Sequence, residues 1–128
     1  MSLRAPLGRV LGHGSAKEGV QHWWLQRLTS IALVPLGIGF VASLLTLPAL
    51  DYATLVAWLH QGSTALGLVL FVLVAARHSQ LGVRVVIEDY VHGGGLKALS
   101  LVIVEFAHVL LAAAAIFAIL KIALGGRL

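Results

Sequence analysis

The 128-residue chain is 59% hydrophobic and only 11% charged, with a mean hydropathy of +0.98. This composition is too apolar for a soluble domain of the same length and indicates an integral membrane protein. The net charge of +4 does not indicate nucleic-acid binding, because the basic residues lie at the ends of apolar blocks instead of in one stripe. The chain has no cysteine, so a metal or haem would need histidine or oxygen ligands.

Three apolar blocks predict three transmembrane helices. They cover residues 28–47, 55–86 and 98–124, and each reaches the roughly 20 residues that a helix needs to cross about 30 Å of hydrocarbon. We therefore predict an all-α, integral membrane fold. Residues 1–27 would form a cytoplasmic arm and interfacial anchor, and residues 28–128 the three-helix membrane domain.

The basic residues predict the orientation of the chain. Several precede the first block, Arg84 and Lys97 flank the second connection, and Lys121 and Arg127 lie at the end of the sequence. The positive-inside rule then places the N-terminus in the cytoplasm or the mitochondrial matrix and the C-terminus on the opposite side. The connection that follows Tyr90 therefore lies on the inner side of the membrane.

The head of the first predicted helix carries two tryptophans and an arginine. Trp23 and Trp24 are interpreted as an anchor at the membrane interface. Arg27 follows about one turn later, and it either reaches the headgroups or turns inward to hold a carboxylate or an anionic cofactor group.

The second block carries a histidine inside its apolar run. Ionisable groups at that depth cost roughly 2.5–3.5 kcal/mol on insertion and are functional candidates by default. Ala75 and Gly82 share a helix face with His78, so the surface beside the imidazole is flat. Such a surface suits a planar macrocycle, which makes His78 a candidate haem ligand, and Arg77 and Arg84 could neutralise haem propionates.

Two other histidines at membrane depth bear on this interpretation. His60 precedes His78 by 18 residues on the same predicted helix, about five turns or 27 Å, which would suit two stacked haems if each found a second ligand. Only His108 in the third block could face His78 within this chain. The sixth ligand of a bis-histidine haem would otherwise come from another subunit.

The third block carries an acid and a base three residues apart, Glu105 and His108. They either neutralise each other or pair with Arg77 in a structural cluster. Alternatively, the three form a polar relay, and the chain is a small transport or assembly protein without a cofactor.

The spacing of four residues resembles a known family. His78, Gly82, Asp89 and Tyr90, within the stretch HSQLGVRVVIEDYVH, resemble the second helix of the smaller hydrophobic membrane anchor of succinate dehydrogenase, respiratory Complex II. The three-helix length and the N-inside orientation agree with this resemblance, as does the head of the first helix, where a histidine and aromatic residues are followed by Arg27, Thr29 and Ser30.

The resemblance implies a fold, a cofactor and partners. In the family, two three-helix anchors hold one haem b between them and bind a flavoprotein and an iron–sulfur protein at the inner membrane face. His78 matches the axial ligand from the smaller anchor, with Gly82 on its face and Arg27 near a propionate. Tyr90 matches the tyrosine that hydrogen-bonds a ubiquinone carbonyl, and Asp89 its acidic neighbour.

The implied function is electron transfer from succinate to ubiquinone in the bacterial inner membrane, or in the mitochondrial inner membrane of a eukaryote. A cytochrome b anchor of a fumarate reductase or of another quinone-linked dehydrogenase is the alternative within the same class. The sequence does not fix the direction of the reaction.

Overall fold

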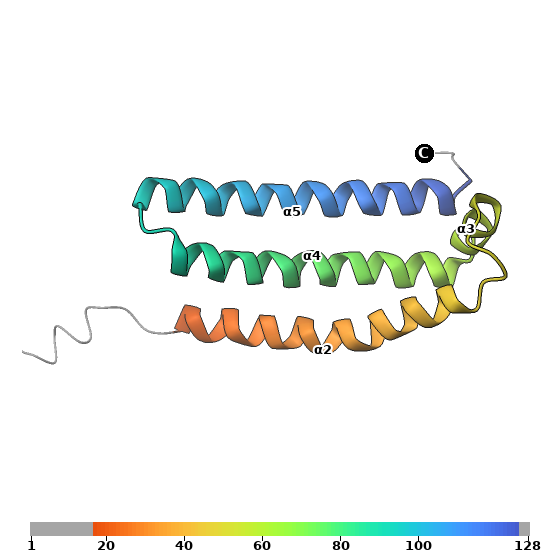
Figure 1. The fold of residues 1–128 in the computed structure, drawn as a ribbon, viewed down its shortest axis with the longest axis horizontal. Helices are drawn as coiled ribbons and strands as arrows, with labels where there is room; N and C mark the ends of the chain where they lie inside the picture. Colours follow the sequence, from red (N-terminus) through yellow and green to blue (C-terminus); the bar gives the residue numbers. More distant parts are fainter. Residues whose placement is uncertain (1–16, 126–128) are drawn as a thin grey trace, which may run out of the picture.

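The computed structural model describes residues 17–125, which form three long helices and one short helix (Figure 1). In chain order these are α2 (Lys17–Leu45), α3 (Tyr52–Leu59), α4 (Gly62–Tyr90) and α5 (Gly94–Ala123). The long helices lie side by side with α4 in the middle, packed against both α2 and α5. The short α3 lies at the end of the bundle where α2 leads into α4. The all-α prediction is confirmed.

The three predicted membrane spans are also confirmed. Val20–Leu45, Gly62–Tyr90 and Gly94–Ala123 are long and apolar enough to cross a membrane. These helices bury little of one another: of the most apolar 18-residue stretch of each, only 6%, 11% and 0%, respectively, is buried. The remaining apolar side chains must therefore face lipid tails or another subunit, since contact with water would oppose folding.

The first helix begins earlier than the apolar block predicts. α2 starts at Lys17, ahead of the apolar block. Residues 20–27 contain neither proline nor glycine, so nothing in them interrupts the helix before the apolar run begins. Trp23 and Trp24 lie in its first turns, both half exposed, with their rings edge to face at 5.1 Å. The predicted arm over residues 1–27 thus overlaps α2, and its first 16 residues lie outside the described residues.

The prediction of one continuous helix over residues 55–86 is wrong. α3 ends at Leu59, and α4 begins only at Gly62. Gln61 has an extended backbone, with φ −73° and ψ 118°, and the chain turns there. The sequence carries a signal for this break, since the polar and small residues 60–64 (HQGST) interrupt the apolar block.

This break separates His60 from the helix that carries His78. His60 follows α3 as its C-cap residue. Its ring Nδ1 lies 3.2 Å from the carbonyl oxygen of Ala123 at the end of α5, so it donates a hydrogen bond there. The regular spacing that would suit two stacked haems is therefore not formed.

The short helix α3 is capped by an acid at its start. Asp51 Oδ1 accepts a hydrogen bond of 2.8 Å from the backbone N–H of Thr54, which satisfies one of the free donors at the helix start. Hydrogen bonding by Thr54, mainly through this N–H, lowers the pKa of Asp51 below its ordinary value of 3.8. Trp58 then packs the helix onto the bundle, where it is buried and lies 6.3 Å from the Phe40 ring.

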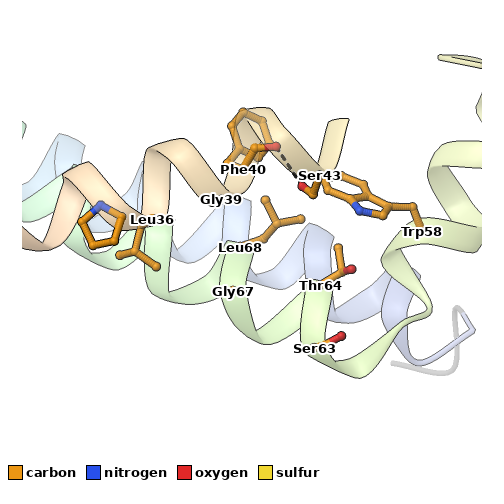
Figure 2. A pocket seen from close by; sticks show the side chains of 10 residues that line it. Leu36, Gly39, Phe40, Ser43, Trp58, Ser63, Thr64, Gly67 and Leu68 are labelled. Carbon is orange, nitrogen blue, oxygen red and sulfur yellow. Dashed lines mark hydrogen bonds between the residues drawn. The ribbon is translucent and has the colours of Figure 1, made fainter. Parts of the chain in front are cut away.

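An apolar groove of about 280 Å³ lies between the second half of α2 and the first half of α4 (Figure 2). Pro35 lies inside α2, and the helix curves toward α3 in Figure 1. Gly39 and Gly67 leave the groove open, since a Cβ at either position would meet nothing within 4 Å. The groove has no ionisable residue in its lining, so it is separate from the candidate site described next.

Candidate functional site

His78 lies on the face of α4 that packs against α2. Its Nδ1 is 3.0 Å from Thr29 Oγ1, and its Nε2 is 3.4 Å from Gln26 Nε2. Thr29 is buried, with 8% of its surface exposed. The imidazole therefore makes uncharged polar contacts between two spans instead of facing lipid.

Gly82 does not leave an open flat surface beside His78 within this chain. A Cβ at Gly82 would lie 3.7 Å from Gln26 Nε2, so the Gln26 side chain covers the place that the glycine leaves free. The amide is weakly held there, because Gln26 Oε1 is buried without a hydrogen-bond partner among the described residues.

A cavity of about 420 Å³ adjoins Gln26 between the first half of α2 and the second half of α4. Its lining is formed by His22, Trp23, Gln26, Leu81, Arg84, Val85 and Glu88. Its lining combines apolar walls with the Arg84 guanidinium, the His22 imidazole and the Glu88 carboxylate. His78 does not line this cavity, but Gln26 both lines it and lies 3.4 Å from His78 Nε2. A haem held by His78 would therefore take the place of the Gln26 amide and extend into the cavity, where Arg84 and His22 are the groups that could hold its propionates.

Arg27 lies elsewhere in this structure. Its guanidinium is 5.3 Å from the centre of the Trp23 ring, a cation–π contact on the exposed side of α2. It is not among the residues that line the cavity. Arg84 instead lines the cavity, where its Nε also pairs with Glu88 Oε1 at 2.8 Å.

Tyr90 and Asp89 lie together at the C-terminal end of α4. Tyr90 is the last residue of the helix and is 77% exposed, while Asp89 is also exposed. At 1.5 Å per residue, Tyr90 lies about 18 Å along the helix from His78. The helix end is fastened to α5, since Lys97 Nζ donates a hydrogen bond of 2.6 Å to the Glu88 carbonyl. The structure thus places His78 and Tyr90 on one rigid helix but in separate sites.

A second polar cluster joins α4 to α5. Arg77 Nη1 donates to Gln80 Oε1 at 2.5 Å, and Gln80 Nε2 donates to Glu105 Oε2. Arg77 Nη1 also lies 3.9 Å from Glu105 Oε1. Of the pairings considered from the sequence, that of Glu105 with Arg77 is formed, and it makes the cluster a structural link between two spans.

His108 is not part of that ion pair. Its Nδ1 donates to the Val104 carbonyl at 2.8 Å, and its Nε2 lies 3.2 Å from Ser79 Oγ. Both ring nitrogens therefore have partners other than Glu105, and the imidazole lies on the α5 side of α4, away from His78. The structure does not place His108 opposite His78.

Sequence reasoning did not assign Gln26 and Thr29 a contact with His78. A signal was present, because residues 22, 26 and 29 recur at helical spacing on one face of the first span. Polar groups on one face of a membrane helix are expected to face the bundle interior. Which helix they meet does not follow from that periodicity.

Comparisons with known proteins show the family of the chain. A family model described as "Succinate dehydrogenase/Fumarate reductase transmembrane subunit" matches residues 1–120. The succinate dehydrogenase hydrophobic membrane anchor subunit of Paracoccus denitrificans is 35% identical over 114 residues, which cover 89% of this chain and 88% of the relative. The subunits of the same name from Rickettsia conorii and Rickettsia bellii are 33% and 31% identical, over 80% and 91% of this chain and 82% and 93% of their own lengths. No solved structure matches the chain.

The matches span most of the chain and include the three membrane helices. They identify it as one subunit of a larger enzyme and not as a catalyst by itself. The chain belongs to the family of succinate dehydrogenase hydrophobic membrane anchor subunits.

Proposed function

We propose that this anchor subunit ligates one haem b through His78 and forms part of a ubiquinone-reducing site with Tyr90 and Asp89. Succinate would be oxidised by a flavoprotein subunit, and electrons would reach the membrane through an iron–sulfur subunit. A larger cytochrome b anchor would supply the second haem ligand. The complex would lie in the bacterial inner membrane, with the N-terminus of this chain on the cytoplasmic side.

The placement of His78 supports the haem assignment. The imidazole lies between α2 and α4, and no charged side chain is hydrogen-bonded to either ring nitrogen among the described residues. Its Nε2 has only the long contact of 3.4 Å to the Gln26 amide, so its lone pair is available to a metal. When bound, the haem supplies a one-electron carrier inside the membrane.

The exposure of Tyr90 supports the quinone assignment. Its side chain is not hydrogen-bonded within residues 17–125, and the residue is 77% exposed at the inner end of α4. A phenol can donate a hydrogen bond to a quinone carbonyl oxygen and stabilise the negative charge that develops during reduction. Asp89, adjacent and exposed to the aqueous side, can relay protons from water.

The fold supports the proposed orientation. The start of α2, the α4–α5 connection and Tyr90 all lie at one end of the bundle (Figure 1). The basic residues Lys17, Arg84 and Lys97 belong to this end, which the positive-inside rule assigns to the cytoplasm. A quinone bound beside Tyr90 would therefore be reduced where soluble subunits can deliver electrons.

The other interpretations gain no support from the geometry. A relay through Arg77, Glu105 and His108 requires continuity, but His108 is bonded to Ser79 and to a backbone carbonyl. The three relatives carry the succinate dehydrogenase name, which favours that direction over fumarate reduction.

The proposal rests most on one observation: between α2 and α4, the His78 ring nitrogens contact only the uncharged side chains of Thr29 and Gln26 among the described residues. We would purify the complex with its partner subunits and record the optical spectrum after reduction. The low-spin b-type band should be present in the unmodified complex and in the His108→Ala control, and absent in His78→Ala. An unchanged low-spin band in His78→Ala, in a complex with all its subunits, would exclude His78 as a ligand.

A further inference from the structure

We propose that Thr29 positions His78 for iron: its hydroxyl oxygen accepts the Nδ1 proton of the imidazole, which fixes the ring and its tautomer and directs the Nε2 lone pair to the haem. This inference rests on the proposed haem ligation by His78. Thr29 itself touches no cofactor in this arrangement and acts only through the histidine.

The hydrogen atoms around Thr29 can be assigned from its three neighbours. Thr29 Oγ1 lies 2.9 Å from the Leu25 carbonyl oxygen, 3.0 Å from the Gln26 carbonyl oxygen and 3.0 Å from His78 Nδ1. The hydroxyl has a single proton. If that proton pointed to Nδ1, two oxygen–oxygen contacts of about 3 Å would have no hydrogen between them and would repel. The hydroxyl therefore donates to a carbonyl of its own helix, and it accepts the N–H of Nδ1.

Ser30 indicates which of the two carbonyl oxygens accepts the Thr29 hydroxyl proton. Ser30 Oγ donates to the Gln26 carbonyl oxygen at 2.8 Å, so that acceptor already has a side-chain donor. The Leu25 carbonyl is then the natural acceptor for the Thr29 hydroxyl. This orientation leaves a lone pair of Thr29 Oγ1 aimed at His78.

The other ring nitrogen then carries the lone pair. With the proton on Nδ1, Nε2 is an acceptor, which agrees with the amide nitrogen of Gln26 as its neighbour at 3.4 Å. That contact is too long for a strong hydrogen bond, and Gln26 Oε1 has no partner in the same place. Gln26 therefore offers little resistance to an iron atom that takes its position at Nε2.

Because Thr29 is buried, its hydrogen bond to His78 is expected to affect how strongly the imidazole binds iron. Thr29 is 8% exposed, so water does not compete for the Nδ1 proton. Partners of this kind fix ligand orientation and raise ligand basicity, and their loss typically costs about 10- to 100-fold in metal affinity or activity. A more basic imidazole stabilises ferric haem, so loss of the hydroxyl should shift the haem midpoint potential to more positive values.

The test measures the haem midpoint potential and the low-spin ferric EPR signal in the intact complex. Thr29→Val should shift the potential upward, change the EPR signal and reduce haem retention, whereas Thr29→Ser should stay close to the unmodified complex. Ser30→Ala is the matched control, since Ser30 lies in the same turn and its hydroxyl bonds only the Gln26 carbonyl. An unchanged potential and EPR signal in Thr29→Val, or an equal shift in Ser30→Ala, would overturn the inference.

A second pair of variants covers the case in which Thr29→Val does not assemble. Thr29→Ser and Thr29→Cys differ by one atom, and a thiol is a poor acceptor, so the cysteine variant should have the more positive potential. Equal potentials would overturn the inference. Failure of this inference is distinguishable from failure of the haem proposal, because only the haem proposal predicts that His78→Ala abolishes the low-spin haem signal.

Discussion

The Nδ1 atom of His78 in α4 lies 3.0 Å from the Oγ1 atom of Thr29 in α2. This contact joins the middle span to the first and holds the imidazole in the bundle before any partner subunit is present. Because α5 contacts α4 on its other side, the polar cluster of Arg77, Gln80 and Glu105 is separate from it. The central helix thus presents one candidate ligand toward α2 and one ion pair toward α5.

Tyr90→Phe should lower ubiquinone reduction by succinate at least about tenfold, approaching the 100-fold that loss of one preorganised donor can cost. Succinate oxidation by an artificial dye should change little, because the dye takes electrons before the quinone site. Tyr52→Phe is the matched control, since Tyr52 is also exposed but lies at the start of α3, at the opposite end of the bundle. Equal losses of quinone and dye activity in Tyr90→Phe would count against a quinone role.

Arg77→Leu and Glu105→Leu should each destabilise the subunit more than the double substitution does. Each single change leaves one charge without its partner within the membrane span, and close ionic partners typically show coupling of about 0.5–3 kcal/mol. The side chains are 44% and 52% exposed in this chain, so the lower part of that range is expected unless a partner subunit covers them. Thermal unfolding of the purified complex in detergent, compared among the two single variants, the double variant and the unmodified complex, measures this coupling. Additive effects would show that the two residues do not interact.

The cap of α3 should weaken in acid. The pKa of Asp51 in the folded chain lies below its ordinary value of 3.8. The carboxylate therefore stabilises the folded cap fully above that pH, and the contribution is lost as the pH falls through the folded pKa. Hydrogen exchange of residues 52–59, corrected for intrinsic rates, should rise in this range. Asp51→Asn keeps a capping oxygen without the charge and should remove the pH dependence, so an unchanged dependence in that variant would assign it to another group.

Gly82→Ala should be tolerated, and Gly82→Phe should not. An added Cβ would lie 3.7 Å from Gln26 Nε2, an ordinary van der Waals distance, so the alanine variant should assemble and keep its haem. A phenylalanine would fill the place of the Gln26 amide beside His78. Haem content per assembled complex measures both variants. Full haem content in Gly82→Phe would show that this face of α4 does not border the cofactor.

Much of the fold could be predicted from composition, because the length of an apolar block determines whether it spans the membrane. The overall hydropathy of the block does not reveal the turn at Gln61, although residues 60–64 (HQGST) are a local turn signal; the contact of His60 with Ala123, by contrast, depends on tertiary packing. For the candidate site, periodicity places Gln26 and Thr29 on one face of the first span, but it does not say that this face meets His78. The pairing of Glu105 with Arg77 was one of several predicted options, and only packing of α4 on α5 selects it.

The central claim, that His78 binds the haem iron, is tested most directly by chemical rescue. The purified His78→Ala complex would be supplied with free haem and examined by EPR, first without and then with added imidazole. We predict that low-spin ferric haem is lost in the variant and restored when imidazole takes the place of the deleted ring. A low-spin signal like that of the unmodified complex, present in the variant without imidazole, would contradict the account.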